Sequence, residues 1–463
     1  MQKSRAELTT LLAQIFPPDQ IKQGDALNGL SPGFHADNFK AGLQVRVTEL
    51  AQAQALVQLA NAAGLSLVPQ GGLTGLAGAA ASAPGQIQVD LRGLSGVELL
   101  DPLNAVAIVK AGTPLAELEA AANAQGLTFG VDLGARDTAT LGGMVSTNAG
   151  GIEAFRYGMI RQRVLGMEAV LPDGSLLCDL ATVTKCNEGY DVKQLLIGAE
   201  GTLGLITRLA VRLSPKVPAR ATCLVAVESA QAAVQAFHRL NGAQGGVLLA
   251  AEMMFQRYAQ TAATEMGLGK LLAFEQAPVY AIFEWGAGSE EAARLRLEEL
   301  LAELFGADLL INALLAKNES DRVDIWRVRE DSWAIDRLYP QGLWYDVSLP
   351  LNRLDAYVSG LETRLAALDP GLRLFAMGHL GDGNLHLTIG AHPAPGAHKP
   401  AVTALVNQEL KAWGGAISAE HGIGLEKKAA LAELGDPGKL AAMAAIKAAL
   451  DPNGVMNPGK IFS

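Results

Sequence analysis

Residues 69–75 read Pro-Gln-Gly-Gly-Leu-Thr-Gly and follow a short apolar segment, LSLVP at 65–69, which predicts a buried strand. Glycine has no Cβ, so a loop with this spacing exposes several backbone N–H groups to an approaching phosphate or pyrophosphate. A tight turn after a strand has the same composition, and this loop alone does not distinguish the two. Its spacing matches neither the GxGxxG nor the GxxxxGKS/T pattern, which argues against a Rossmann or Walker nucleotide site.

Two more glycine-dense segments follow, at 130–158 (GVDLGARDTATLGGMVSTNAGGIEAFRYG) and 198–204 (GAEGTLG). Residues 71–204 contain 22 of the 51 glycines in this chain of 463 residues. A dinucleotide is long enough to need close backbone approach at several points along its length. Three glycine loops in one region therefore favour a dinucleotide site over three unrelated turns.

Helix and strand signals alternate through the first half of the chain. Residues 49–62 have helical apolar spacing between Thr48, a predicted N-cap, and Gly64, a predicted C-cap. A strand is predicted at 86–91 and a hairpin around 101–104. This alternation indicates an α/β or α+β fold and excludes a repeat array.

Composition and charge exclude several kinds of partner. The chain carries 37 basic and 47 acidic residues, a net charge of −10, so a general attraction to nucleic acid or anionic lipid is not expected. It has no run of 18 or more apolar residues, and its N-terminus is polar, so neither a membrane span nor a signal peptide is predicted. Three cysteines, Cys178, Cys186 and Cys223, without CxxC spacing indicate a reduced, cytoplasmic protein.

Six motifs, in order, give the chain a family resemblance. PQGGLTG, DLGARDTATLGGMVSTNAGG and GYDVKQLLIGAEGTLGLIT resemble the FAD-binding domain of vanillyl-alcohol-oxidase-type flavoproteins. GHLGDGNLH, SAEHGIG and NPGKIF resemble the D-2-hydroxy-acid dehydrogenase branch of that family, which includes D-2-hydroxyglutarate and D-lactate enzymes. The resemblance covers the chain from about residue 35 to 463.

The resemblance implies an α+β fold with three parts. They are a two-subdomain FAD-binding domain at 1–212, an α+β substrate (cap) domain at 213–412, and a short C-terminal helical segment at 413–463 that completes the flavin and metal site. The change to Ala/Leu/Glu-rich sequence after residue 213 agrees with the first boundary.

The resemblance also implies the residues that contact FAD. Its pyrophosphate would lie against Pro69, Gly71, Gly72, Leu73, Thr74 and Gly75. Its ribityl and isoalloxazine parts would lie against Leu133, Gly134, Thr138, Gly142, Gly143, Ser146 and Asn148. Its adenosine end would lie against Glu200, Gly201, Gly204 and Ile206, and Asn457 would make a further flavin contact. Covalent relatives attach the flavin to a histidine in or near the first loop; that loop has none and His35 is far upstream, so non-covalent FAD is predicted.

The segment 378–386 (GHLGDGNLH) predicts a β-hairpin with two histidines. If Asp382-Gly383 is a two-residue turn, His379 and His386 face each other on one side of the sheet, with Cβ atoms about 4.5–5.5 Å apart. Two imidazoles at that separation can bind one metal ion, although they can also simply pair across a hairpin. The resemblance marks His379, His386 and Glu420 as a divalent metal site, with zinc the first candidate and manganese or iron next.

The resemblance assigns substrate chemistry to four other residues. His421 would be the general base, Arg329 would bind a substrate carboxylate, Tyr345 lies on the strand that faces the substrate, and Asn384 is a candidate to reach it. An exposed helix charge and a structural histidine are the alternatives for Arg329 and His421.

Three positions depart from the hydroxyglutarate pattern. Trp344 stands where a lysine is usual, Trp333 where a serine or threonine is usual, and Thr388 where an asparagine is common. The loss of a cation and a hydroxyl weakens the case for a second substrate carboxylate. Two tryptophans instead suggest a larger or more apolar substrate side chain.

The sequence thus predicts an FAD- and metal-dependent dehydrogenase that oxidises a D-2-hydroxy acid to the 2-keto acid and passes electrons to a separate acceptor. D-2-hydroxyglutarate, D-lactate and a more apolar acid are the candidate substrates. The sequence carries no signal for the oligomeric state, although members of the family often form homodimers. Two alternatives remain: a flavin-free metal hydrolase or lyase that uses His379, His386 and Glu420, and a flavin-binding protein without catalysis.

Overall fold

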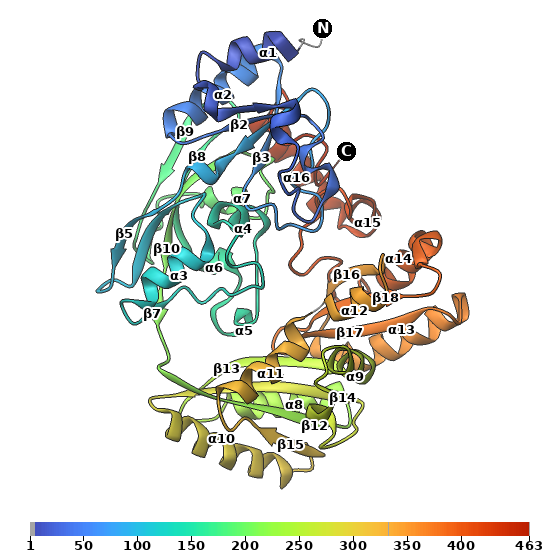
Figure 1. Ribbon diagram of the computed structural model, residues 1–463. Coiled ribbons are helices and arrows are strands. Elements are labelled where there is room, and N and C mark those ends of the chain that lie inside the picture. Colours follow the sequence, from blue (N-terminus) through green and yellow to red (C-terminus); the bar gives the residue numbers. More distant parts are fainter. Residues whose placement is uncertain (1–4, 332, 463) are drawn as a thin grey trace. The chain divides into compact units, whose positions relative to one another are not determined.

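The computed structural model describes residues 5–331 and 333–462, which divide into two compact units. The first unit combines the described residues up to 150 with 157–216 and 420–462. The second unit combines 151–156 with 217–419. The chain therefore leaves the first unit after residue 216 and returns to it at residue 420, as the colours of Figure 1 show.

The first unit contains a four-stranded sheet of order β1-β2-β4-β3, in which β2 and β3 are parallel to β4 and β1 is antiparallel to β2. Its strands are β1 (Ile21–Gln23), β2 (Leu43–Arg46), β3 (Ser66–Gln70) and β4 (Gln86–Asp90). Helix α2 (Leu50–Ala63) covers it with Leu56 and Val57, and Gly64 ends the helix at φ 65°. The parallel pair places the first glycine loop at the carboxyl end of β3.

A five-stranded antiparallel sheet, of order β5-β6-β10-β8-β9, completes the first unit. Its strands are β5 (Val97–Asp101), β6 (Val106–Lys110), β8 (Val164–Val170), β9 (Leu176–Asp179) and β10 (Leu205–Arg212), and a small pair is formed by β7 (Leu127–Thr128) and β11 (Ser214–Pro215). Leu118 and Leu141 from two helices pack on this sheet against Leu209 and Val109, all of them buried. Leu141 belongs to the second glycine segment and Leu209 follows the third, so both segments are anchored in the same hydrophobic core.

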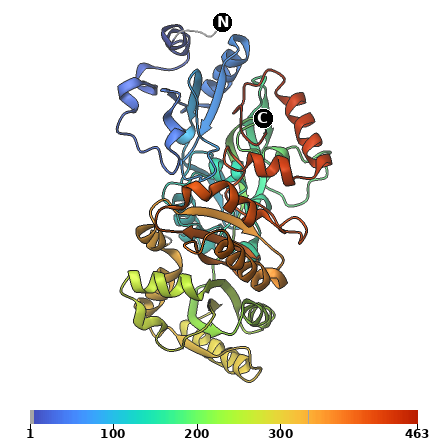
Figure 2. The ribbon, with the colours of Figure 1, turned by 90° about the vertical axis from the view of Figure 1, so that its right-hand side faces the viewer.

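The remaining helices of the first unit are short, except at the C-terminus. They are α1 (Arg5–Leu12), α3 (Leu115–Asn123), α4 (Leu141–Thr147), α6 (Ile160–Arg163), α7 (Lys193–Leu196), α15 (Lys428–Leu434) and α16 (Pro437–Leu450), and α5 (Ala154–Tyr157) lies where the chain passes between units. Helix α16, red in Figure 2, packs Ile446 and Leu450 on the core of the five-stranded sheet, and Lys447 Nζ donates to the Thr202 carbonyl at 2.8 Å. The C-terminal segment is thus bound to the glycine-rich half of the chain.

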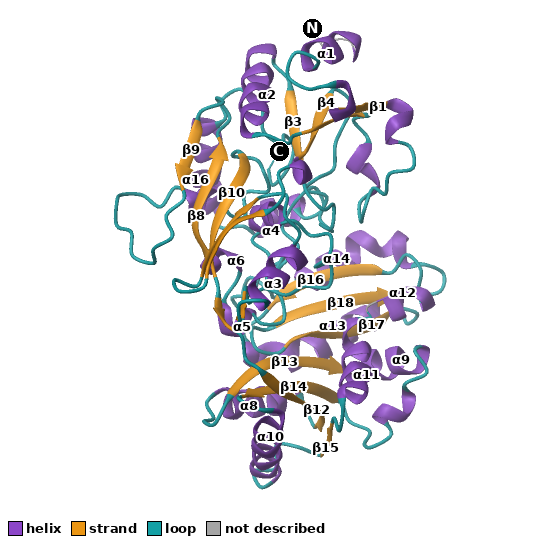
Figure 3. Cartoon of the chain, turned by 60° about the vertical axis from the view of Figure 1, so that its left-hand side comes forward, coloured by secondary structure: helices purple, strands orange, loops and turns teal. Residues whose placement is uncertain are grey.

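The second unit is built on one antiparallel sheet of order β15-β12-β14-β13-β17-β18-β16 (Figure 3). Its strands are β12 (Ala219–Val227), β13 (Val247–Phe255), β14 (Val279–Ala287), β15 (Asn312–Leu315), β16 (Leu343–Ser348), β17 (Arg373–His379) and β18 (Asn384–Gly390). The central strands are apolar on both sides because helices cover both faces of this sheet.

The two faces of this sheet carry different helices. One face packs on α8 (Ala230–Asn241), α10 (Glu290–Phe305), α13 (Leu354–Leu368) and α14 (Lys399–Asn407). The other packs on α9 (Gln256–Glu265), α11 (Glu319–Glu330) and α12 (Trp333–Leu338). Short 3-10 helices lie at Pro18–Gln20, Gly24–Leu27, Ala36–Phe39, Leu91–Gly93, Gly269–Leu272, Leu351–Arg353 and Pro395–His398.

The mixed helix and sheet architecture agrees with the α+β prediction, and the local predictions at 49–62, 86–91 and 101–104 correspond to α2, β4 and the β5–β6 hairpin. One cap differs: Glu49 occupies the N-cap position of α2, while Thr48 binds the Gln52 side chain at 2.9 Å through its N–H.

Among residues 5–331 and 333–462, no helix is both long and apolar enough to cross a membrane.

The predicted register of the histidine hairpin was wrong. His379 pairs with Asn384, and Met377 pairs with His386, so the loop has four residues, 380–383. A two-residue type I′ turn needs positive φ at both central residues, but Gly383 (φ 77°) adopts it and Asp382 does not. The shift is two residues, so both histidines keep the same face because strand side chains alternate with period two.

Candidate active site

The first glycine loop lies against the backbone of the second glycine segment. A Cβ built on Gly72 would overlap the Thr138 carbonyl, and one built on Gly71 would overlap the Thr140 hydroxyl. A Cβ on Gly75 would meet nothing within 4 Å. Leu73, between them, is held at φ 58°, an uncommon conformation for a leucine that tends to mark functional loops. The loop is therefore packed through its first glycines and open at its last.

The second glycine segment ends in α4 and a left-handed turn. Gly142 packs so closely on Ala111 that a Cβ would lie 2.7 Å from the alanine Cβ. Ser146 Oγ donates to the Gly142 carbonyl at 2.7 Å, and Asn148 ends the helix at φ 54°. A Cβ on Gly134 would meet nothing within 4 Å, so this glycine, like Gly75, borders open space.

The other predicted flavin residues of this segment have mixed environments. Gly143 would bring a Cβ to 3.1 Å from Thr140 Oγ1, and Thr138 is exposed. Leu133 packs at the edge of the core of the five-stranded sheet, and Thr74 and Pro69 are both half-buried.

The third glycine segment is mainly a packing element. A Cβ on Gly201 would lie 2.7 Å from Pro69 Cγ, and one on Gly204 would lie 2.8 Å from the Val170 carbonyl. Ile206 is buried in the core of the five-stranded sheet. The carboxylate of Glu200 accepts from the N–H groups of residues 423 and 424 at 2.6 and 2.8 Å, so both of its oxygens have partners within the protein.

Asn457 joins these segments and bears on the fit of FAD. Its side-chain Nδ2 donates to the Glu200 carbonyl at 2.7 Å and to the Ala79 carbonyl at 2.9 Å. Its Oδ1 is buried without a hydrogen-bond partner among the described residues. A buried acceptor in this position needs a donor. That requirement and the open glycines, Gly75 and Gly134, fit a bound flavin nucleotide.

His35 is distant in sequence from the first glycine loop but not in space. The N–H of its neighbour Phe34 donates to the Leu73 carbonyl at 3.3 Å, and a Cβ on Gly78 would lie 2.9 Å from His35 Nε2. His35 Nε2 also lies 3.7 Å from a carboxylate oxygen of Glu426. Non-covalent FAD remains a prediction, but the argument from sequence distance does not support it.

The two hairpin histidines converge in the second unit. They occupy the same face of β17 and β18, and their Nε2 atoms are 3.3 Å apart. Two Zn–N bonds of about 2.05 Å at a tetrahedral angle also place their nitrogens about 3.3 Å apart. The side chains of His379 and His386 therefore fit one divalent ion, even though their register differs from the predicted one.

A buried carboxylate on the next strand orients His379. Glu252 of β13 is fully buried, and its Oε1 lies 2.7 Å from His379 Nδ1. A carboxylate on Nδ1 fixes the ring and directs Nε2 toward His386, an arrangement that many metal-binding histidines share. Glu252 Oε2 lies 2.6 Å from Arg329 Nη2, and Arg329 Nε is buried without a partner among the described residues. Glu252 thus links the predicted carboxylate-binding arginine to a predicted metal ligand.

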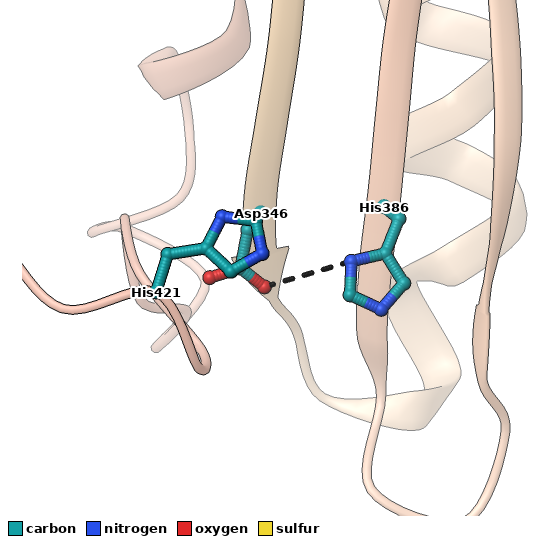
Figure 4. Close-up of side chains that lie close together, drawn as sticks. All are labelled: Asp346, His386 and His421. Atoms are coloured by element: carbon teal, nitrogen blue, oxygen red, sulfur yellow. Dashed lines mark ion pairs between the residues drawn. The ribbon is translucent and has the colours of Figure 1, made fainter. Parts of the chain in front are cut away.

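Asp346 is a site residue that the sequence analysis did not single out. It pairs with His386 in the β16–β18 ladder, is fully buried, and has its Oδ1 3.9 Å from His386 Nδ1 (Figure 4). Asn384 Nδ2 donates to Asp346 Oδ1 at 2.8 Å, and Asn384 Oδ1 is buried without a partner among the described residues. The Tyr-Asp-Val strand sequence carried this signal, since an aspartate in an apolar strand needs a buried partner.

Tyr345 does not lie with these residues. It alternates with Asp346 along β16 and so points to the opposite face, where its hydroxyl is 2.8 Å from Thr403 Oγ1 of α14. Burial raises the pKa of this tyrosine. The substrate-facing role of Tyr345 stays a prediction, and on β16 it is Asp346 and not Tyr345 that shares a face with His386.

The three positions that depart from the family pattern lie together. Trp344 and Thr388 are direct partners in the β16–β18 ladder, and the rings of Trp333 and Trp344 have centroids 5.9 Å apart. Thr388 is two residues from His386 on the same face, a distance of about 7 Å along the strand. Both tryptophans are exposed, Trp333 by 49% and Trp344 by 39%.

The remaining predicted residues, Glu420 and His421, follow directly after Ala419. The Ala419 N–H donates to Asp346 Oδ2 at 3.0 Å, which fixes the end of the second unit beside the histidine face. Glu420 begins the return of the chain to the first unit. Figure 4 also labels His421, two residues beyond Ala419.

Family models match most of the chain. A model described as FAD binding domain matches residues 42–178, and one described as FAD linked oxidases, C-terminal domain, matches residues 216–461. The second match covers more than half of the chain. The second model begins at residue 216, where the chain passes from the first unit to the second.

Curated relatives are similar over most of their lengths. The chain is 33% identical over 425 residues to a D-2-hydroxyglutarate dehydrogenase of Xanthomonas citri pv. viticola, which covers 89% of this chain and 87% of the relative. It is 32% identical over 407 residues to a mitochondrial D-2-hydroxyglutarate dehydrogenase of Danio rerio, which covers 88% of this chain and 75% of the relative.

Solved structures identify the fold. Substrate-bound p-cresol methylhydroxylase has a TM-score of 0.76 at 15% identity, with 99% of this chain and 97% of that one covered. The 4-ethylphenol oxidase of Gulosibacter chungangensis has a TM-score of 0.76 at 16% identity, with 99% and 98% covered. These likenesses confirm the predicted fold class. With the family models and the curated relatives, they show that the chain belongs to the FAD-dependent D-2-hydroxy-acid dehydrogenases, within the flavoproteins of the vanillyl-alcohol-oxidase type.

Proposed function

We propose that this protein oxidises a D-2-hydroxy acid with a bulky or apolar side chain to the 2-keto acid, using FAD and a divalent metal ion. Family membership supports the oxidation and the FAD. The convergence of His379 and His386, with Glu252 behind the first of them, is the observation that carries the metal site.

Glu420 is the proposed third metal ligand and His421 the proposed base. The Ala419 N–H donates to Asp346. Glu420 is the next residue, so its Cα lies about 3.8 Å from that of Ala419. Asp346 is in turn the ladder partner of His386. Covalent connection to this anchored residue supports the assignment. Zinc suits the two-nitrogen, one-carboxylate ligand set, with manganese and iron as the other candidates.

Each protein group has a defined task in the proposed reaction. Arg329 binds the substrate carboxylate, held in place by its ion pair with Glu252. Asn384 is fixed by Asp346 and offers its buried Oδ1 to a donor on the substrate. His421 removes the proton from the 2-hydroxyl group, and a divalent ion held by His379, His386 and Glu420 would supply positive charge that lowers the pKa of that hydroxyl. Bound FAD would supply the hydride acceptor for C2, and a separate acceptor would reoxidise it.

The tryptophan pair supports the choice of substrate class. A second substrate carboxylate, as in 2-hydroxyglutarate, would need a cation or donors about 7 Å from the metal ligands along the sheet. Trp333, Trp344 and Thr388 occupy that region instead. Apolar rings bind an aliphatic or aromatic side chain and leave a carboxylate without partners. We therefore expect D-phenyllactate or D-2-hydroxyisocaproate to react faster than D-2-hydroxyglutarate.

Anaerobic flavin reduction tests this function. Purified protein is expected to be yellow, and a panel of D- and L-2-hydroxy acids is added without oxygen while flavin absorbance is followed. The D-acids with apolar side chains are expected to bleach it fastest. Colourless protein that cannot be reconstituted would favour the flavin-free hydrolase or lyase, and flavin that no acid reduces in metal-loaded protein would favour the non-catalytic alternative.

Two histidine variants test the roles. His421→Ala is expected to abolish flavin reduction with FAD still bound, and His386→Ala is expected to lose the metal. His238→Ala is the matched control, because His238 is exposed on α8 of the second unit. Unchanged reduction in His421→Ala, or full metal content in His386→Ala, would reject the corresponding assignment.

A further inference from the structure

Glu200, predicted above to lie against the adenosine end of FAD, is a buried carboxylate of the glycine segment 198–204 whose two oxygens both bond to the protein. Glu200 is 5% exposed, and burial raises its pKa. Its Oε1 accepts from the Ile423 N–H at 2.6 Å, and its Oε2 accepts from the Gly424 N–H at 2.8 Å. These donors are two and three residues beyond His421. A charged acceptor with two backbone donors is a strong, directional contact.

The main chain of Glu200 is held as firmly as its side chain. Its N–H donates to the Ser146 carbonyl at 2.7 Å, and its carbonyl accepts from Asn457 Nδ2 at 2.7 Å. Its φ of 51° is unusual for a glutamate and is maintained by these neighbours. Ser146 and Asn457 are both predicted flavin contacts, so Glu200 connects the flavin-binding segments to the loop that carries His421.

The loop itself is shaped to receive this carboxylate. Gly422 has a φ of 76°, and a Cβ there would lie 2.5 Å from Glu200 Oε1. Gly424 has a φ of 50°, and a Cβ there would overlap the Ala77 carbonyl. The Leu425 N–H donates to that same carbonyl at 2.8 Å. The loop after His421 therefore has one compact conformation, with Glu200 on one side and the end of the first glycine loop region on the other.

We propose that Glu200 is a positioning residue that fixes the Glu420-His421 pair relative to the flavin-binding loops. It acts through the N–H groups of residues 423 and 424 and does not itself touch substrate. The catalytic consequence rests on the proposed roles of Glu420 and His421, whereas the contact is independent of them. All residues of the argument belong to the first unit.

Glu200→Gln is the direct test, because the amide keeps the shape of the side chain but replaces one acceptor by a donor. Hydrogen exchange followed by mass spectrometry should show faster exchange in peptides covering 420–426, with β8 and β10 unchanged. The rate of flavin reduction should fall about 10- to 100-fold, with the half-saturating acid concentration nearly unchanged and FAD content retained. Bound metal should also decrease, because Glu420 is displaced.

Two further variants keep the test decisive. Glu168→Gln removes another buried carboxylate of the first unit, one bonded to Arg208 and Thr207, and should change stability without changing exchange at 420–426. Gly422→Ala presses on Glu200 from the loop and should reproduce the Glu200→Gln pattern, with little added effect in the double variant.

The outcomes separate this proposal from the proposed function. Normal exchange at 420–426 and normal flavin reduction in Glu200→Gln would overturn the positioning role while leaving the function intact. Faster exchange at 420–426 without any loss of reduction would also overturn it. If the unmodified protein oxidises no 2-hydroxy acid, the exchange and metal measurements still report on Glu200, so the two failures are distinguishable.

Discussion

Glu252 illustrates how a single side chain can define a site without being a ligand. It is fully buried, and its two oxygens meet His379 and Arg329 at 2.7 and 2.6 Å. A buried carboxylate is stabilised by such partners, and removal of it leaves them without compensation. One residue therefore sets the ring orientation of the proposed metal ligand His379 and the position of the guanidinium group proposed to bind the substrate carboxylate.

Glu252→Gln should lower metal affinity about 10- to 100-fold, since partners behind a ligand typically contribute that much. Titration of metal-free protein with zinc or manganese measures this directly. Glu284→Gln is the matched control: Glu284 is also buried in the same sheet, but it binds Thr222 and Trp326 instead of the histidines. Equal affinities in both variants would remove Glu252 from the metal site.

Trp344→Lys combined with Trp333→Thr should shift substrate preference toward D-2-hydroxyglutarate. The change restores a cation and a hydroxyl where the family usually has them, next to Thr388 on the histidine face. Both positions are exposed, where an ion pair is worth about 1 kcal/mol or less, so the ratio of kcat/KM values for D-2-hydroxyglutarate and D-phenyllactate should rise by about two- to fivefold. An unchanged ratio would place the substrate side chain elsewhere.

Lys460 gives a prediction for pH. It is 4% exposed, and burial lowers its pKa from 10.5 to about 8. The folded state therefore disfavours the charged form, which costs stability below pH 8 and is relieved as pH rises from 8 toward 10.5. The difference in unfolding free energy between flavin-free wild type and Lys460→Met should change by up to about 3 kcal/mol across that window. Chemical denaturation at pH 7, 8, 9 and 10 measures it, and a flat difference would contradict the lowered pKa.

The β17–β18 hairpin is the element on which the proposed metal site depends. The sequence GHLGDGNLH predicted its existence, its two strands and the shared face of the histidines. It did not predict the register, because the dipeptide Asp382-Gly383 is compatible with more than one loop. Two contacts select a four-residue loop instead. The Leu380 side chain is fully buried, and the Gly383 N–H donates to the His379 carbonyl at 3.1 Å.

Gly383→Ala should disrupt this hairpin and reduce metal binding. Its φ is 77°, and a Cβ would overlap the Leu349 carbonyl, so the expected loss of stability is about 2 kcal/mol or more. Thermal unfolding and metal titration measure the two effects. Gly396→Ala is the control, since a Cβ there would meet nothing within 4 Å and its φ is not positive. Wild-type metal affinity in Gly383→Ala would show that the loop is not needed to hold the histidines.

At the scale of the whole molecule, each unit has hydrophobic cores of its own. Two cores pack on the sheets of the first unit, and two pack on the faces of the seven-stranded sheet in the second. The predicted flavin contacts belong to the first unit and the histidine pair to the second. Ligands of the two kinds should therefore stabilise different parts of the chain.

Calorimetry should separate these effects. FAD at about 100 times its dissociation constant adds about 2.7 kcal/mol to the unit that binds it, which corresponds to a shift of roughly 5–10 °C. This shift is expected for the transition of the first unit, whereas removal of metal with a chelator should lower mainly the transition of the second, which holds two of the three proposed ligands. One transition that responds equally to both treatments would indicate a single cooperative unit.

The sequence by itself determined the family, the α+β class, most local elements and the identity of the glycine loops and histidines, because these depend on short patterns with a local physical cause. Only the tertiary structure decided which face each residue occupies and what lies behind it. Asp346, and not its neighbour Tyr345, shares a face with the histidines, because the side chains of a strand alternate between its two faces. Glu252 and Glu200 acquired their roles from partners 127 and more than 220 residues away. Such contacts arise from packing between distant segments, and no local pattern encodes them.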